Sequence, residues 1–172
     1  MAKMKEIKTN AMRILESMKI PFHQYTYECE EFVDGLQTAD LLGLPHEKVY
    51  KTLVTQSGRE YFVFVIPIEA ELDLKKAARA VGQKALSMIH VKDINAVTGY
   101  IRVGCTALGM KKQYVTRIET SAKALPRIIV SGGRIGSQIE LSPEDLARAA
   151  GAEFADVIRG EANHEQPMIE QE

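Results

Sequence analysis

The sequence predicts a mixed α/β fold in which helices flank a largely antiparallel, barrel-like sheet. Three observations lead to this class. Segments with strand patterning outnumber segments with helical patterning, short hairpin connections join the strands, and helices are interspersed without regular strand–helix–strand alternation. The chain has 172 residues, of which 45% are hydrophobic and 26% charged, so it is long enough for one domain with its own core.

Five segments carry helical spacing of apolar residues or the residues that start and stop helices. They are residues 9–19, 38–42, 73–81, 92–97 and 142–151. The first can be capped by Thr9 or Asn10 and stops before Pro21. Asp73 caps the third, and Ser142 begins the last, where a proline and two acidic residues follow in the first turn.

Seven segments alternate in hydrophobicity or are apolar throughout, as strands are. They are residues 22–27, 49–54, 61–66, 85–90, 114–119, 127–131 and 138–141. The second and third flank a turn at residues 57–59 and form a hairpin, and the third is apolar on both faces and therefore central. Residues 153–159 close the folded body.

Composition excludes several classes of protein. No apolar run could span a membrane, and the N-terminus lacks the apolar part of a secretion signal, so we expect a cytoplasmic protein. Two cysteines cannot form a disulfide framework, and the four histidines have no metal-ligand spacing, so we expect neither a metal nor another cofactor.

The charge is unevenly distributed along the chain. Residues 160–172 hold four acidic residues and no Lys or Arg, and without them the net charge changes from −1 to +3. The basic body is compatible with a polyanionic partner. We expect a single domain over residues 1–158 and a disordered acidic tail over residues 159–172.

Lys51 is unusual within the predicted strand V49-Y-K-T-L-V54. Alternation puts it on one face with Val49 and Leu53, which are both apolar. Two interpretations follow. Lys51 extends its ammonium to solvent from an edge position, or it reaches into a cleft, where a partly desolvated ammonium binds a phosphate or carboxylate or stabilises developing negative charge.

Two glycine-rich segments are further candidates. V130-S-G-G-R-I-G136 follows an apolar strand, and its backbone N–H groups could form an anion-binding nest, although a simple hairpin turn explains it equally. Residues 99–109 contain Cys105, beside which no base can be placed from sequence. Neighbouring acidic residues would raise the pKa of Cys29, so we do not expect a catalytic cysteine.

Short motifs follow one another in a fixed order between about Ala11 and Ile158. They are I20-P-F22, Tyr27, Phe32, V49-Y-K-T-L-V54, L74-K-K-A-A78, G99-Y100, Gly104, G109-x-K-K112, V130-S-G-G133, Gly136 and D145-L-A-x-x-x-G-A-E-F154. In this ordered set the chain resembles the YbaK/EbsC family of aminoacyl-tRNA deacylases, which is related to the editing domain of bacterial prolyl-tRNA synthetases.

The resemblance implies an enzyme that removes a wrong amino acid from the 3′ end of a tRNA. The best-known members act on cysteine attached to proline tRNA, so a trans-acting deacylase that works beside prolyl-tRNA synthetase is implied. In these enzymes the cysteinyl thiol is thought to attack its own ester, and the protein supplies positioning and charge stabilisation. From composition we expect no metal and no membrane partner, and the oligomeric state stays open.

The family's site residues fall, position by position, on Lys51, Thr52, Tyr27, Phe32, Gly104, Ser131, Gly132 and Gly133. Lys51 is expected to anchor the terminal phosphate or the ester, while loop amides hold the carbonyl oxygen. Tyr27 and Phe32 are expected to pack against the adenine or the aminoacyl group.

The chain departs from the family pattern near the expected amino-acid pocket. Val103 replaces a glycine, Thr106 and Ala107 replace Ser-Pro, and Ser137 and Gln138 stand where many relatives have an aspartate. Two alternatives to cysteine removal therefore stay open. One is deacylation of another small amino acid, alanine or proline, and the other is non-catalytic binding of tRNA ends or nucleotides.

Overall fold

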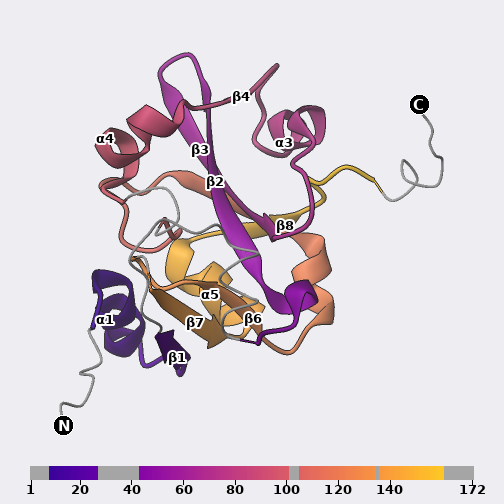
Figure 1. The fold of residues 1–172 in the computed structure, drawn as a ribbon. Coiled ribbons are helices and arrows are strands. Elements are labelled where there is room, and N and C mark those ends of the chain that lie inside the picture. Colours follow the sequence, from indigo (N-terminus) through magenta and orange to yellow (C-terminus); the bar gives the residue numbers. More distant parts are fainter. Residues whose placement is uncertain (1–7, 27–42, 101–104, 135, 161–172) are drawn as a thin grey trace, which may run out of the picture.

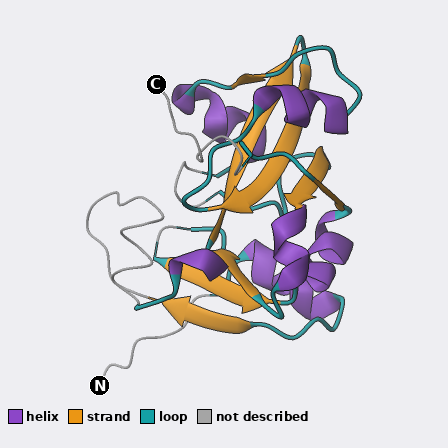
Figure 2. Ribbon diagram, turned by 90° about the vertical axis from the view of Figure 1, so that its right-hand side faces the viewer, coloured by secondary structure: helices purple, strands orange, loops and turns teal. Residues whose placement is uncertain are grey.

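The structure, a computed structural model, describes residues 8–26, 43–100, 105–134 and 136–160. Their strands form two sheets, one above the other, with helices beside each (Figures 1 and 2). The helices are α1 (Asn10–Ser17), α3 (Leu74–Ala80), α4 (Ile94–Thr98) and α5 (Pro143–Ala150), with short 3₁₀ turns η1 (His46–Lys48), η2 (Val91–Asp93) and η3 (Thr120–Ala124). The strands are β1 (His23–Thr26), β2 (Tyr50–Ser57), β3 (Glu60–Pro67), β4 (Ser87–Met88), β5 (Val115–Glu119), β6 (Ile128–Ser131), β7 (Ser137–Leu141) and β8 (Glu153–Ala155).

The larger sheet has the strand order β4-β2-β3-β5-β8. Strands β2 and β3 pair along their whole lengths, which confirms the predicted hairpin. Strand β3 lies between β2 and β5, and its residues 63–66 are completely buried, which confirms that it is central. Strands β3, β5 and β8 run parallel to one another, because helical segments connect them.

The smaller sheet has the order β1-β7-β6 and is antiparallel throughout. The predicted hairpin of β6 and β7 is confirmed, and β1 joins it from the N-terminal end of the chain. One face of this sheet packs against α1 and α5 in the main core. That core includes Met12 and Leu15 of α1, Val130 and Ile139 of the sheet, and Leu146 of α5.

A single parallel bridge between Val49 and Ile129 joins the two sheets. Strand β2 begins at this point beside β6 and continues into the larger sheet, so one strand connects the two (Figure 1). The arrangement is an open, barrel-like pair of sheets flanked by helices. The predicted mixed α/β class is therefore confirmed.

Three predicted caps are present. Thr9 accepts a hydrogen bond from the Met12 N–H at 3.2 Å, Asp73 accepts from two N–H groups of α3, and Ser142 accepts from the Asp145 N–H at 3.1 Å. The helix expected over residues 38–42 and almost all of the acidic tail lie outside the described residues. In the described ranges, no helix has the length and apolar character needed to cross a membrane.

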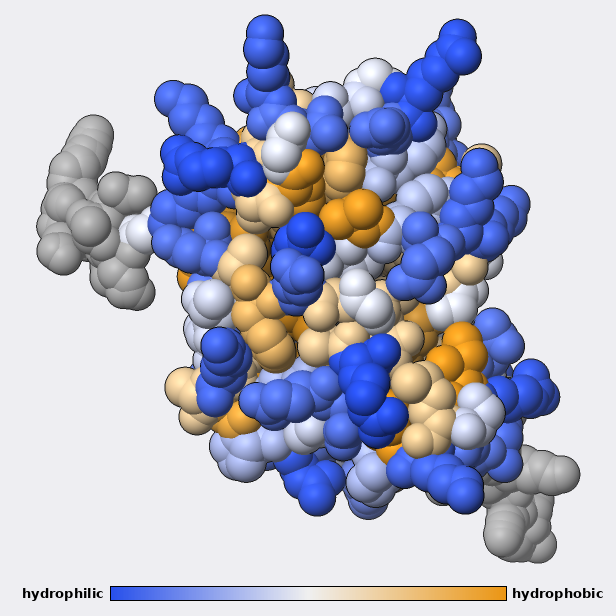
Figure 3. Space-filling model, turned by 180° about the vertical axis from the view of Figure 1, so that it is seen from behind, coloured by the Kyte–Doolittle hydropathy of each residue, from blue (hydrophilic) through white to orange (hydrophobic). Residues whose placement is uncertain are grey.

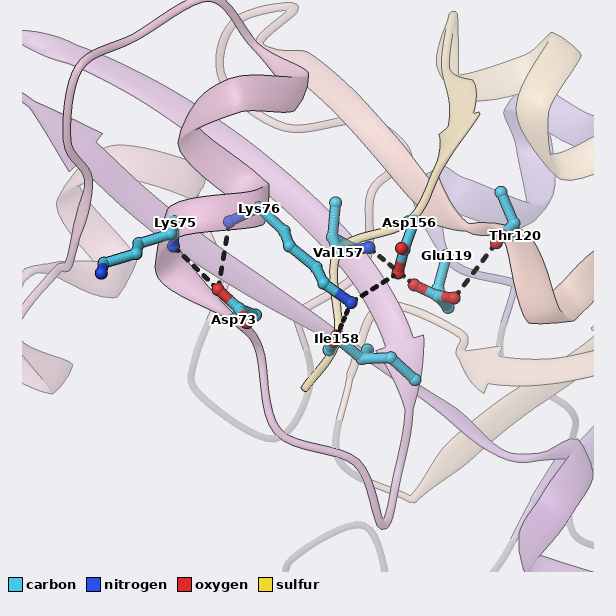
Figure 4. A network of polar contacts seen from close by, with 8 residues as sticks. All are labelled: Asp73, Lys75, Lys76, Glu119, Thr120, Asp156, Val157 and Ile158. Carbon is cyan, nitrogen blue, oxygen red and sulfur yellow. Dashed lines mark hydrogen bonds and ion pairs between the residues drawn. The ribbon is translucent and has the colours of Figure 1, made fainter. Parts of the chain in front are cut away.

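A polar network ties α3 to the last described segment (Figure 4). The Lys76 ammonium donates to Asp156 Oδ1 at 3.1 Å and to the Ile158 carbonyl at 2.9 Å. Nearby, the buried Glu119 carboxylate accepts the Val157 N–H at 2.9 Å. These bonds hold the chain after β8 against α3 and against the end of β5.

The surface mixes hydrophobic and charged side chains. On the face seen in Figure 3, hydrophobic residues lie among hydrophilic ones that project outward. The large hydrophobic side chains described as exposed are Leu74, Met88, Val91 and Val115. None of them is a predicted site residue.

Candidate functional site

Lys51 occupies the apolar face of β2 that strand alternation predicted. Its cross-strand partner is the completely buried Ile66, and Val49 and Leu53 flank it along the strand. Val49 belongs to a small cluster with Ile129, whereas Leu53 and Ile66 belong to the cluster under α3. The half-buried Lys51 side chain therefore starts between two apolar clusters.

The bridge between the sheets brings Ser131 to the same place. Val49 and Ile129 pair in parallel, so Lys51 and Ser131 lie at equivalent positions two residues further along β2 and β6. Because side chains two residues apart share a face, both lie on the side of the Val49–Ile129 cluster. The structure thus places two predicted site residues that are far apart in sequence on neighbouring strands, each two residues beyond the point where the strands meet.

In the smaller sheet, the strand pairing continues from Ser131 across β7 to β1 and so defines a row of neighbouring residues. Ser131 pairs with Gln138, and Gln138 pairs with Tyr25 of β1. In the adjacent row, Ile129 pairs with Glu140. Ser131, Gln138 and Glu140 are each less than a tenth exposed, so this face buries polar side chains while the opposite face carries the core.

A hydrogen-bonded network fixes the carboxylate of Glu140. The Tyr25 hydroxyl donates to Oε1 at 2.8 Å, and the Lys48 ammonium donates to Oε2 at 2.8 Å. Burial raises the pKa of the Glu140 carboxyl, but the two hydrogen bonds and the charges of Lys48 and Arg127 outweigh burial and leave the pKa below its ordinary value. The hydrogen bond to Glu140 and burial raise the pKa of Tyr25.

The glycine-rich segment forms the turn between β6 and β7. The Gly132 N–H donates to the Ser137 carbonyl at 2.9 Å, and the Gly133 N–H donates to Ser131 Oγ at 3.1 Å. The φ of Gly133 is +108°, a conformation that favours glycine, and a Cβ on Gly132 would collide with the Ser137 side chain. The hairpin-turn interpretation accounts for both N–H groups, while the Ser131 hydroxyl still has its own proton to donate.

The other predicted site residues are not brought to this face. Thr52 is half-buried and pairs with Val65, so by alternation its side chain lies on the face of β2 opposite to Lys51. Tyr27, Phe32 and Gly104 lie outside the described residues. Their expected roles stay predictions.

The Cys105 thiol is unsuited to act as a nucleophile. It is buried, and burial raises its pKa to about 12 in spite of a hydrogen bond with Thr98 that lowers it. The thiol is therefore protonated at neutral pH. Within the described ranges, no group of three or more His, Cys, Asp or Glu side chains is arranged to hold a metal ion.

A hollow of about 320 Å³ lies beside the start of α3, lined by Leu72, Asp73, Leu74, Lys75 and Arg159. It includes none of the predicted site residues. The better candidate site is the place where the two sheets meet, which we call the seam; it carries Lys51 of β2, Ser131 of β6 and Glu140 of β7. Its described groups are an ammonium, a hydroxyl and a fixed carboxylate, which can position a substrate and stabilise negative charge.

Sequence reasoning missed Tyr25, Lys48 and Glu140. The signal that could have found Glu140 is the alternation in S137-Q-I-E-L141, which places Gln138 and Glu140 on one face. Alternation alone does not say that β1 and the turn η1 would supply partners for that face.

Residues 30–149 match the family described as the aminoacyl-tRNA editing domain. The chain belongs to this family. Over 164 residues it is 43% identical to an Enterococcus faecalis (strain ATCC 700802 / V583) protein named "Putative Cys-tRNA(Pro)/Cys-tRNA(Cys) deacylase EbsC", a match that covers 94% of this chain and 100% of the relative. The resemblance to the YbaK/EbsC family is thereby confirmed.

Two solved structures have the same fold. One is described as "a putative trans-editing enzyme for prolyl tRNA synthetase", with a TM-score of 0.74 and 20% identity over 88% of this chain and 99% of the other. The second is described as a hypothetical protein, with a TM-score of 0.77 and 21% identity over 86% of this chain and 97% of the other. At these identities the likeness concerns the fold alone.

Proposed function

We propose that the protein is a trans-acting aminoacyl-tRNA deacylase that removes cysteine from mischarged proline tRNA. The observation that carries the proposal is the 43% identical relative, whose whole length is matched and whose name gives Cys-tRNA(Pro) and Cys-tRNA(Cys) as substrates. Membership of the editing-domain family supports an enzyme that acts on aminoacyl-tRNA. Such an enzyme would work in the cytoplasm, beside a synthetase such as prolyl-tRNA synthetase.

The described groups suit a reaction in which the substrate provides the nucleophile. The cysteinyl thiol loses its proton, its sulfur bonds to the ester carbonyl carbon, and the bond from that carbon to the ribose oxygen breaks. The ribose oxygen takes up a proton, and cysteine leaves as a cyclic thioester that water later opens. Lys51 would anchor the terminal phosphate or stabilise negative charge on the carbonyl oxygen, and the Ser131 hydroxyl would donate to the same region.

The remaining expected contacts complete this proposal. Tyr27 and Phe32 would pack against the adenine or the aminoacyl group, and Thr52, Gly104, Gly132 and Gly133 would line the pocket. Thr52 would contribute through its backbone, because its side chain lies on the other face of β2.

A second candidate is deacylation of alanine or proline by attack of water. The observation that favours it is Thr106, which replaces a serine of the family pattern and whose buried hydroxyl has no hydrogen-bond partner among the described residues. A pocket altered at this position could prefer a different small side chain. A non-catalytic binder of tRNA ends is the remaining alternative.

The decisive experiment measures deacylation of cysteinyl-, alanyl- and prolyl-tRNA(Pro) by wild type, by Lys51→Ala and by Lys76→Ala. Lys76 is a matched control, because its side chain is partly buried and paired with a carboxylate away from the seam. We expect wild type to cleave the cysteinyl ester fastest and Lys51→Ala to be slower by a factor of about 100 or more, the cost of losing one charge-stabilising group. Lys76→Ala should match wild type.

Other results would exclude one part of the proposal each. If the protein binds tRNA(Pro) carrying each of the three amino acids but cleaves none of the esters, only the non-catalytic alternative remains. Equal rates on alanyl and cysteinyl esters would exclude attack by the substrate thiol. Full activity in Lys51→Ala would remove Lys51 from the site while leaving the reaction itself established.

A further inference from the structure

The network around Glu140 contains a cation that the proposed reaction does not use. Lys48 lies in the η1 turn, three residues before Lys51, so their Cα atoms are at most about 11 Å apart. The turn is fixed by backbone bonds from the Lys48 N–H to Pro45 and from the Val49 N–H to His46. Val49 in turn bridges to β6, so the same short segment places Lys48 and Lys51 at the seam.

The Glu140 carboxylate holds the Lys48 ammonium in one position. Glu140 is itself held by Tyr25 from a different strand, so the ammonium is supported by β7, β1 and η1 together. An ammonium has three hydrogens to donate, and one hydrogen bond to Glu140 leaves two for a ligand. The Lys48 side chain is 28% exposed, which leaves room for a ligand to approach.

The local charges favour an anion. Arg127 is exposed immediately before β6, and its charge acts to lower the pKa of both Glu140 and Tyr25, although the hydrogen bond and burial raise the pKa of Tyr25 overall. Lys48 and Arg127 thus both act on one ionised carboxylate, and Lys51 lies three residues further along the chain from Lys48. A single-stranded nucleic acid offers a row of phosphates to such a series of cations.

We propose that Lys48 binds a backbone phosphate of the tRNA 3′ end upstream of the terminal nucleotide, and that Glu140 is the positioning residue that holds Lys48 for this contact. The inference rests on the proposed function, since it concerns the polynucleotide part of the same substrate. Lys51 would then recognise the reacting end, and Lys48 would recognise the chain that leads to it.

The test compares cysteinyl-tRNA(Pro) with the cysteinyl ester of adenosine, which has no phosphate. We expect Lys48→Met to reduce the ratio of kcat/KM on tRNA to kcat/KM on the adenosine ester by about tenfold, through KM, whereas Lys48→Arg restores it. Binding of uncharged tRNA should lose about 0.7 from the slope of log affinity against log salt concentration, the value for one phosphate contact on a single strand. Lys76→Met, with a side chain 26% exposed, is the matched control and should change neither quantity.

The substitution Glu140→Gln distinguishes two possible roles of Glu140, because they predict opposite changes in tRNA affinity. Removal of a negative charge near a polyanion should tighten tRNA binding if Glu140 acts only through its charge. If Glu140 positions Lys48, the same substitution should weaken binding and raise KM for tRNA. Thermal unfolding of each variant separates both outcomes from loss of folding.

Several results would overturn the inference. They are an unchanged salt slope in Lys48→Met, an equal loss on both substrates, and tighter tRNA binding by Glu140→Gln. If wild type cleaves neither cysteinyl-tRNA(Pro) nor the adenosine ester, the proposed function is instead overturned. The salt slope for uncharged tRNA would still decide the role of Lys48.

Discussion

Lys48 and Lys76 each hold a carboxylate, and their side chains are exposed to similar extents, 28% and 26%. Their partners differ. The Glu140 side chain is 11% exposed and receives a second hydrogen bond from Tyr25, whereas the Asp156 side chain is 66% exposed. Lys76 also donates to a backbone carbonyl, and its network joins two segments of the chain (Figure 4).

The difference indicates what each network does. An exposed ion pair contributes little to stability, and the Lys76 contacts are explained by the attachment of the chain after β8 to α3. A buried carboxylate on a sheet face costs desolvation, which its partners must offset. The Glu140 network lies on the same sheet face as the predicted site residue Ser131, so we infer that it serves the site as well as the stability of the sheet.

The largest expected effect comes from removal of the two carboxylates. Glu140→Ala deprives Lys48 and Tyr25 of their shared acceptor and should lower the free energy of unfolding by about 2 kcal/mol. Asp156→Ala should lower it by less than about 1 kcal/mol, because that pair is exposed. In thermal unfolding these values correspond to losses in Tm of about 4–8 °C and below about 4 °C. Equal losses would show that the two networks are energetically alike.

The sequence predicted well those structural features that depend on residues close together in the chain. Caps at Thr9, Asp73 and Ser142 and the β2–β3 hairpin depend on neighbouring residues, and all are present in the structure. Alternation placed Lys51 on an apolar face, and the ordered motifs gave the family. These features are predictable because capping, turns and strand periodicity act over a few residues.

The pairing of distant segments was not predictable. Lys48 and Glu140 are 92 positions apart, and Tyr25 and Glu140 are 115 apart. Strand alternation gives the face on which a residue lies but not the strand beside it, so the row from Tyr25 to Lys51 could not be assembled from sequence. The parallel pairing of β5 with β3 and β8 was missed for the same reason.

A smaller effect is expected from the second hydrogen bond to Glu140. Tyr25→Phe removes only the hydroxyl, so the Glu140 carboxylate keeps Lys48 but loses one donor. We expect a loss of about 1 kcal/mol in urea unfolding. If Tyr25 also helps to hold Lys48 through Glu140, affinity for uncharged tRNA should fall by less than it does in Lys48→Met. Unchanged stability would mean that the hydroxyl is replaced by water and that Glu140 is held by Lys48 alone.

The smallest expected effect is the dependence of stability on pH, because burial and pairing shift the pKa of Glu140 in opposite directions. The net shift is downward from the ordinary value of 4.5, so ionised Glu140 stabilises the folded state above that pH. As pH falls through the folded-state pKa, the carboxylate is protonated and this contribution is lost. In urea unfolding between pH 3 and 7, the free energy of unfolding of wild type should therefore exceed that of Glu140→Gln by a constant margin near neutral pH. This margin should shrink below about pH 4.5.

Asp156→Asn, which alters the exposed pair, is the control, and its free energy of unfolding should remain within a few tenths of a kcal/mol of wild type over the same range. A margin for Glu140→Gln that grows in acid would mean that the pKa of Glu140 in the folded protein is raised above 4.5. Burial would then outweigh the hydrogen bonds from Lys48 and Tyr25, and the Glu140 network would not stabilise the ionised carboxylate.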